Sequence, residues 1–149
     1  MKNTNKEYIL YILVRNDLPS LNPGKAMAQV IHAGHIFSAT NHKTQAYIDW
    51  AEARGFGTTV TLSADERTID KLVDSVPTPQ SGWIVDPTYP LIAPADVLGM
   101  IDLNKLSEVP HITNDGKNVV LCRKEKTCAY LFGDKEILQQ WTYNLPMYQ

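Results

Sequence analysis

Lys25, Gln29 and His32 are spaced by four and then three residues in a segment whose pattern is typical of a helix. Residues at these spacings share one face of a helix. An ammonium, an amide and an imidazole in one stripe can together hold a polar or anionic ligand, and the positive end of the helix dipole near Lys25 favours an anion. A solvated lysine and a hydrogen-bonded structural histidine are the plainer interpretations of the same residues.

The strand and loop before this helix decide where the stripe lies. Residues 7–15 are almost all apolar, as expected of a central strand buried on both faces. Asn22 is a suitable N-cap, Pro23 suits the first turn, and the helix is predicted to end near residue 39. The stripe would then lie where the first strand ends, which is the usual ligand-binding edge of an open α/β sheet. The rest of the helix surface is expected to pack on the sheet through Met27, Val30, Ile31, Gly34 and Phe37.

The remaining elements alternate between helix and strand. The S-x-x-E pattern from Ser63 to Glu66 predicts a capped helix start, and Asn114-Asp115-Gly116-Lys117 predicts a hairpin turn. The pattern predicts helices at 44–53, 63–76, 91–106 and 135–143, strands at 58–62, 82–85 and 127–132, and a hairpin at 111–121. This order indicates a three-layer α/β fold with a mixed four-stranded sheet, elements in the order βααβαββα, and an inserted segment before the last strand.

Composition and charge narrow the class of protein. With 149 residues, of which 44% are hydrophobic and 20% charged, the chain fits one globular domain. A net charge of −2 argues against a surface that is basic throughout, but not against a local basic patch. Two cysteines are too few for a disulfide framework, and no apolar run is long enough to span a membrane, so a cytoplasmic protein is expected. The sequence has no glycine-rich phosphate motif and no metal-ligand spacing, so no cofactor or metal is expected.

Three motifs give the chain a resemblance to a known family. They are R-x-D-L at 15–18, G-K-x-x-A-Q-x-x-H-A at 24–33 and S-x-D-E at 63–66. Together with the order of elements, they resemble the type-two peptidyl-tRNA hydrolases of archaea and eukaryotes, over roughly residues 7–86 and 125–143. The resemblance implies one domain of this type over 1–149, with 88–124 as an insertion that contains a β-hairpin. It also implies a hydrolase of translation, which cleaves the ester between a peptide and its tRNA.

The resemblance further implies roles for individual residues. Lys25 would position a phosphate or stabilise the oxyanion, Asp86 would orient or deprotonate water, and Thr127 would hydrogen-bond substrate or water as the third catalytic residue. Structural roles stay open as well, because aspartate before proline is a common turn former and threonine often begins a strand. Substrate binding would fall to Arg15, Asp17, Gln29 and His32. For Arg15 and Asp17 a surface ion pair is the plainer alternative.

One stretch departs from the family pattern. Where the resemblance predicts D-x-G-R-T, the chain has Asp86-Pro87-Thr88-Tyr89-Pro90. A second function therefore stays open, that of a catalytically inactive scaffold that binds RNA or a nucleotide-like ligand. A third is a regulatory interaction module that offers the hairpin at 111–121 as an edge strand. The expected partner is peptidyl-tRNA or the acceptor end of tRNA, no membrane contact is expected, and a homodimer is left open.

Overall fold

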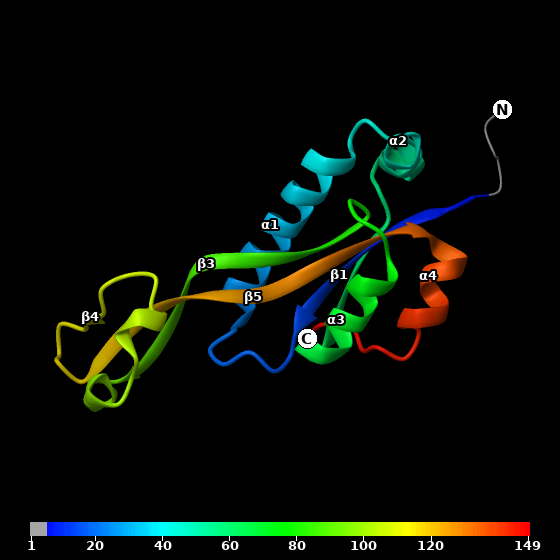
Figure 1. Cartoon of the computed structure of the whole chain (residues 1–149). Coiled ribbons are helices and arrows are strands. Elements are labelled where there is room, and N and C mark those ends of the chain that lie inside the picture. Colours follow the sequence, from blue (N-terminus) through cyan, green and yellow to red (C-terminus); the bar gives the residue numbers. More distant parts are fainter. Residues whose placement is uncertain (1–5) are drawn as a thin grey trace.

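The computed structural model describes residues 6–149, in which a central mixed sheet lies between two layers of helices (Figure 1). The strands are β1 (Tyr8–Arg15), β2 (Thr59–Ala64), β3 (Ser81–Pro94), β4 (His111–Ile112) and β5 (Asn118–Asp134). Their order is β2-β1-β5-β3, with β4 paired to β5. The β1–β2 pair is parallel and the other pairs are antiparallel. The predicted three-layer α/β fold is confirmed, with the short β4 as a fifth strand.

Helices cover both faces of this sheet. Helices α1 (Pro23–Asn41) and α2 (Gln45–Glu52) pack on one face, and α3 (Glu66–Ser75) and α4 (Lys135–Thr142) pack on the other. The predicted order βααβαββα is confirmed once β4 is set aside. Among the described residues, no helix has both the length and the apolar character needed to cross a membrane.

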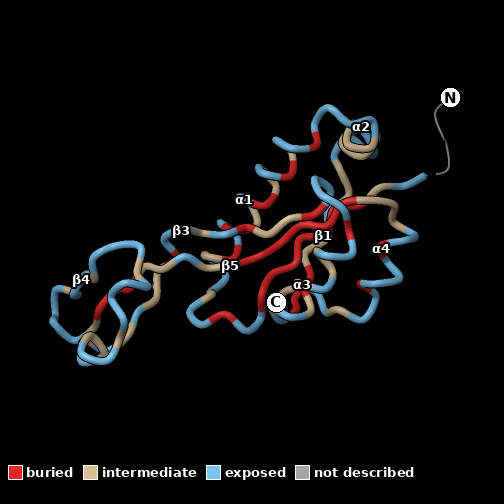
Figure 2. Tube along the Cα trace, viewed as in Figure 1, coloured by how far each residue is buried: buried red, intermediate tan, exposed pale blue. Residues whose placement is uncertain are grey.

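β1 lies at the centre of both hydrophobic clusters. From residue 9 to residue 14, alternate side chains enter the cluster under α3 and α4 and the cluster under α1 and α2. Each of these side chains is at most 5% exposed. A strand buried on both faces is therefore confirmed at residues 8–15. Figure 2 shows this buried strand, and the part of β5 beside it, in red.

The face that α1 turns to the sheet differs from the prediction. Its buried residues are Ala26, Gln29, Ala33, Phe37 and Asn41. Met27 and Ile31, which were expected to pack on the sheet, are 64% and 71% exposed. The two alanines let the helix approach the sheet closely, and Phe37 packs edge-on against Trp50. Phe37 is buried as predicted and Val30 packs against the cluster, so the prediction is right for these two residues. It is wrong for Met27 and Ile31 because small residues and amides fill the rest of the packed face, and a search for large apolar side chains passes over them.

β3 and β5 extend beyond the sheet as an arm, defined here as residues 89–123. In the arm, β3 up to Pro94 pairs with the first part of β5, and β4 pairs with the other side of β5. Figures 1 and 2 show the arm projecting from one end of the molecule, with most of its residues exposed. The predicted hairpin at 111–121 lies in the arm. The segment expected as an insertion, 88–124, thus forms the outer part of one long hairpin.

The helix predicted at 91–106 is not formed. β3 continues through this region to Pro94, and two short 3₁₀ turns follow, at Ala95–Gly99 and Leu103–Lys105. The apolar residues that suggested a helix are partly accounted for by the pairing of Leu91 with Leu121 across the arm. A short apolar run does not distinguish strand from helix, and here the pairing with β5 decides the outcome.

The capping box predicted for α3 is also wrong. The helix begins at Glu66, and its N-cap is Asp65, whose carboxylate accepts from the Thr68 N–H at 2.8 Å. Ser63 belongs to β2 instead, because the parallel pairing with β1 continues as far as Ala64. The Asn22 cap predicted for α1 is confirmed.

Candidate functional site

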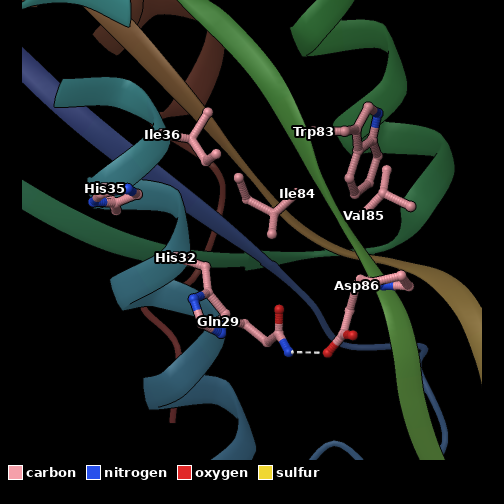
Figure 3. Close-up of a pocket in the computed structure, with 9 residues that line it drawn as sticks. Gln29, His32, His35, Ile36, Trp83, Ile84, Val85 and Asp86 are labelled. Carbon is pink, nitrogen blue, oxygen red and sulfur yellow. Dashed lines mark hydrogen bonds between the residues drawn. The ribbon is translucent and has the colours of Figure 1, made fainter. Parts of the chain in front are cut away.

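Gln29 joins α1 to the two long strands through both ends of its side-chain amide. Its Nε2 donates to Asp86 Oδ2 at 2.8 Å (Figure 3), and its Oε1 accepts from the Thr127 hydroxyl at 2.8 Å. A carboxylate can only accept, so the amide must turn its nitrogen to Asp86. Thr127 is fully buried and Gln29 is 5% exposed. The structure thus brings three of the residues predicted from the sequence into one hydrogen-bonded series.

A β-bulge in β5 accounts for the direction of Thr127. Ile84 pairs with Cys128 and the next residue of β3 pairs with Lys126, so Thr127 is an extra residue in β5. Regular alternation would turn Thr127 and Cys128 to opposite faces. Both contact Gln29 instead, because the Cys128 thiol donates to the Gln29 backbone oxygen at 3.4 Å. Bulges often re-aim side chains next to functional sites.

A second irregularity, in β3, holds Asp86. Between the pairs formed by Asp86 and Tyr89, two residues of β3 lie opposite one residue of β5. Within this bulge, the Thr88 N–H donates to Asp86 Oδ1 at 2.9 Å. Since Gln29 occupies the other oxygen, both carboxylate oxygens of Asp86 are oriented. Each oxygen has a further lone pair, so the carboxylate can still accept a hydrogen bond from water.

Lys25 lies against the base of the arm. Its Nζ donates to the Pro90 backbone oxygen at 3.0 Å and is 5.2 Å from the centre of the Tyr89 ring. Tyr89 is fully buried, and its hydroxyl donates to the Pro19 backbone oxygen at 3.3 Å. Burial, followed by the charge of Glu125, raises the pKa of Tyr89. The neutral ring supports the ammonium by a cation–π contact, and an ammonium with three donors has donors left for a ligand.

A pocket of about 460 Å³ opens beside Asp86, between α1 and the outer edge of β3 (Figure 3). His32 and His35 line it from α1 and are exposed. The pocket therefore places one imidazole of the predicted stripe within the same space as the Asp86 carboxylate. The lining residues are Gln29, His32, His35, Ile36, Trp83, Ile84, Val85, Asp86 and Pro87.

Arg15 and Asp17 belong to a separate ionic cluster at the end of β1. The guanidinium lies 2.9 Å from Asp17 and 2.9 Å from Glu125. It also lies 3.3 Å from Glu66, at the start of α3. Burial alone would raise the pKa of Asp17, but its hydrogen bond with Arg15 lowers it. With Arg15 only 7% exposed, this cluster ties strand ends to α3 and does not line the pocket beside Asp86.

Sequence reasoning missed the residues that hold Lys25. Tyr89 and Pro90 were noted only as a departure from the family pattern, yet they supply the ring and the carbonyl that contact the lysine. It also missed Trp83, which lines the pocket. The sequence did offer one signal for Tyr89. It follows Asp86 by three residues, so its ring could have been expected to pack near the end of the strand that carries Asp86.

Comparison with protein-family models finds no match for the chain, and comparison with curated proteins finds no significant relative. In the part of the chain that the structure describes, no three His, Cys, Asp or Glu side chains gather as metal ligands would. The candidate site rests on its own geometry, which combines a carboxylate, an amide and a hydroxyl in series with an open pocket.

Proposed function

We propose that the protein hydrolyses the ester bond of peptidyl-tRNA, with Asp86 as the residue that orients and deprotonates water. The observation that carries this proposal is the series of hydrogen bonds from Thr127 through Gln29 to Asp86, which ends at an open pocket. The substrate class comes from the resemblance of the motifs at 15–18 and 24–33 to type-two peptidyl-tRNA hydrolases. Two free thiols are compatible with the cytoplasm, where we place this reaction.

Asp86 would act as the general base. Water attacks the ester carbonyl carbon and gives a proton to Asp86, whose two oxygens are held by Gln29 and Thr88. When the tetrahedral intermediate collapses, the bond from carbon to the ribose oxygen breaks. Asp86 then returns the proton to that oxygen, which restores the terminal hydroxyl of the tRNA. The peptide leaves as a carboxylic acid, which carries the second proton of the water and loses it to solvent to become the carboxylate.

Lys25 would supply positive charge near this reaction. Its Nζ is fixed by Pro90 and the Tyr89 ring, and one of its three donors is used in the described structure. A fixed donor contributes most when it faces developing negative charge, because the protein does not reorganise at the moment of reaction. We assign Lys25 to the oxyanion or to a phosphate of the tRNA acceptor end.

A second candidate function is binding of an RNA or nucleotide-like ligand without hydrolysis. The contact of Lys25 with Pro90 favours it, because the arm already uses one donor of the cation that a hydrolase would need. The two functions share a pocket and differ in turnover.

Acyl release from N-acetyl-aminoacyl-tRNA tests the proposal. We expect the wild-type protein to release the acyl group, and we expect Asp86→Asn to lose at least about 100-fold in kcat while staying folded. Asp74→Asn, an exposed carboxylate on α3, is the matched control and should hydrolyse as the wild type does. Release at the same rate by Asp86→Asn would remove Asp86 from the mechanism. Salt-dependent tRNA binding without release would favour the second candidate.

A further inference from the structure

The two outer edges of the sheet differ in whether a further segment of the chain pairs with them. Along β2, the C-terminal segment adds a short antiparallel stretch, in which Leu62 lies opposite Met147. The Ser63 N–H donates to the Pro146 oxygen at 2.8 Å, and the Tyr148 N–H donates to the Thr61 oxygen at 3.1 Å. The sheet thus already accepts an extended segment at one edge. In the sheet order of the described residues, β3 is the other edge.

Trp83 turns its backbone groups outward at this second edge. The Phe132 N–H donates to the Gln80 oxygen at 2.8 Å. The register that pairs Ser81 with Leu131 and Gly82 with Tyr130, continued by one residue, places Gln80 opposite Phe132. In an antiparallel pair, hydrogen-bonded residues alternate with residues whose N–H and C=O point away. Gly82 and Ile84 therefore face β5, and Trp83 presents its N–H and C=O on the opposite side. Such an edge can accept a further strand.

The pocket beside Asp86 runs along this same edge. β3 contributes residues 83–87 to it, and α1 contributes a row that includes His32 and Ile36. Figure 3 shows the α1 side chains on one side of the pocket and the β3 strand on the other. An edge that offers backbone groups beside a groove for alternate side chains is the arrangement by which proteins bind extended peptides.

We propose that the outer edge of β3 at Trp83 binds the peptide part of the substrate as an added strand parallel to β3. This inference rests on the proposed hydrolysis, which places the ester, and so the C-terminal end of the peptide, at Asp86. β3 runs from Ser81 toward Asp86, so a peptide that leaves the site along the groove runs in the same direction as β3. At about 3.3 Å per residue, Trp83 faces roughly the third residue from the ester.

A substrate series tests the added strand. Peptidyl-tRNAs that carry N-acetylated peptides of one to five residues are hydrolysed, and kcat/KM is measured for each. We expect kcat/KM to rise about three- to ten-fold once the peptide reaches three or four residues, which corresponds to one or two net hydrogen bonds. N-methylation of single amides should reverse the gain at alternate positions only, because alternate amides of a strand face its neighbour.

Two variants at one position test the protein side. Trp83→Ala and Trp83→Pro both remove the indole, but only Trp83→Pro removes the outward N–H, and proline is tolerated at an edge strand. We expect the ratio of kcat/KM for four-residue and one-residue peptides to fall toward one in Trp83→Pro and to remain above one in Trp83→Ala. If Trp83→Pro does not fold, the N-methylated substrates carry the test.

The outcomes separate the two proposals. Hydrolysis of the one-residue substrate, with kcat/KM independent of peptide length and of methylation, would overturn the added strand and leave the hydrolase intact. A methylation effect equal at every position would also overturn the added strand. No hydrolysis of any substrate would overturn both.

Discussion

The inner and outer halves of the β3–β5 hairpin share two continuous strands but have different surroundings. The inner half, from Ser81 to Asp86 with its partners in β5, is covered by helices and carries Thr127, Cys128 and Ile84 in buried positions. The outer half is the arm, and its exposed apolar residues are Ile92, Met100, Leu103, Val109 and Ile112. The candidate site lies where the two halves meet, between the two bulges. The strand pairing is therefore irregular at the place where side chains are turned into the site.

The two halves also relate differently to the core. Both hydrophobic clusters consist of residues outside the arm. The arm has a small buried interior of its own, which includes Val119 at 0% and Leu121 at 8% exposure. The base of the arm contacts the candidate site, because Pro90 and Tyr89 hold the Lys25 ammonium. We therefore expect the base of the arm to matter for function and the tip to matter little for stability of the body.

Gln29→Leu should have the largest effect on the inner half. The change leaves the buried Thr127 hydroxyl with only the Ile84 oxygen, at 3.4 Å, as an acceptor and frees one oxygen of Asp86. A buried polar group that loses its partner costs about 1–3 kcal/mol, so the free energy of unfolding in urea should fall by about that amount. Hydrolysis should fall at least tenfold with it. Gln45→Ala removes an exposed amide from α2 and is the control, with an expected change within about 0.5 kcal/mol. A Gln29→Leu variant as stable and as active as the wild type would contradict the role given to Gln29.

The two cysteines allow the burial of the two halves to be compared, because Cys128 lies in the inner half and Cys122 in the arm. Burial raises the pKa of Cys128 to about 12, and burial together with Glu108 raises the pKa of Cys122 less strongly. The thiolate is the reactive form, so at pH 8 we expect Cys122 to react slowly with a disulfide reagent and Cys128 to react only after unfolding. Counting modified thiols by mass spectrometry in native and denatured samples measures this. Equal rates in the native protein would contradict the difference in burial.

Shortening the arm should have the smallest effect on stability. Replacement of residues 92–120 by Asn-Gly joins Leu91 to Leu121, which already pair. We expect the free energy of unfolding to stay within about 2 kcal/mol, because the core is unchanged and a shorter connection costs less entropy to close. We also expect hydrolysis to persist. A matched deletion of 88–124 removes Tyr89 and Pro90 and should lose activity. Loss of folding in the shorter deletion would show that the arm tip stabilises the body.

Much of the fold could be predicted from the sequence. The apolar run at 7–15, the Asn22 cap and the alternation of helices and strands each have a local cause, and each is confirmed. The helix predicted at 91–106 is wrong because pairing with β5, which is distant in sequence, outweighs the local pattern. The sheet-facing side of α1 was predicted correctly at Phe37 but not at Gln29, since a buried Gln29 is stable there only with Thr127 and Asp86 as partners.

The candidate site could be predicted only in part. Gln29, Asp86 and Thr127 were selected from motifs and a family resemblance, and the structure brings them within hydrogen-bond distance of one another in series. The bulge that turns Thr127 inward depends on the register of β3 and β5, for which the sequence offers no local signal. The contacts of Lys25 with Tyr89 and Pro90 depend on the path of the arm and were unforeseen for the same reason.

In the proposed ester hydrolysis, Thr127, Gln29 and Asp86 act as one unit. Single-turnover hydrolysis of N-acetyl-aminoacyl-tRNA by the wild type, Asp86→Asn, Thr127→Val and the double variant tests it most directly. Residues that act through one another give non-additive losses. We therefore predict that the double variant is no slower than Asp86→Asn alone. Losses that multiply in the double variant would contradict the coupling of these residues, and no hydrolysis by the wild type would contradict the proposed function.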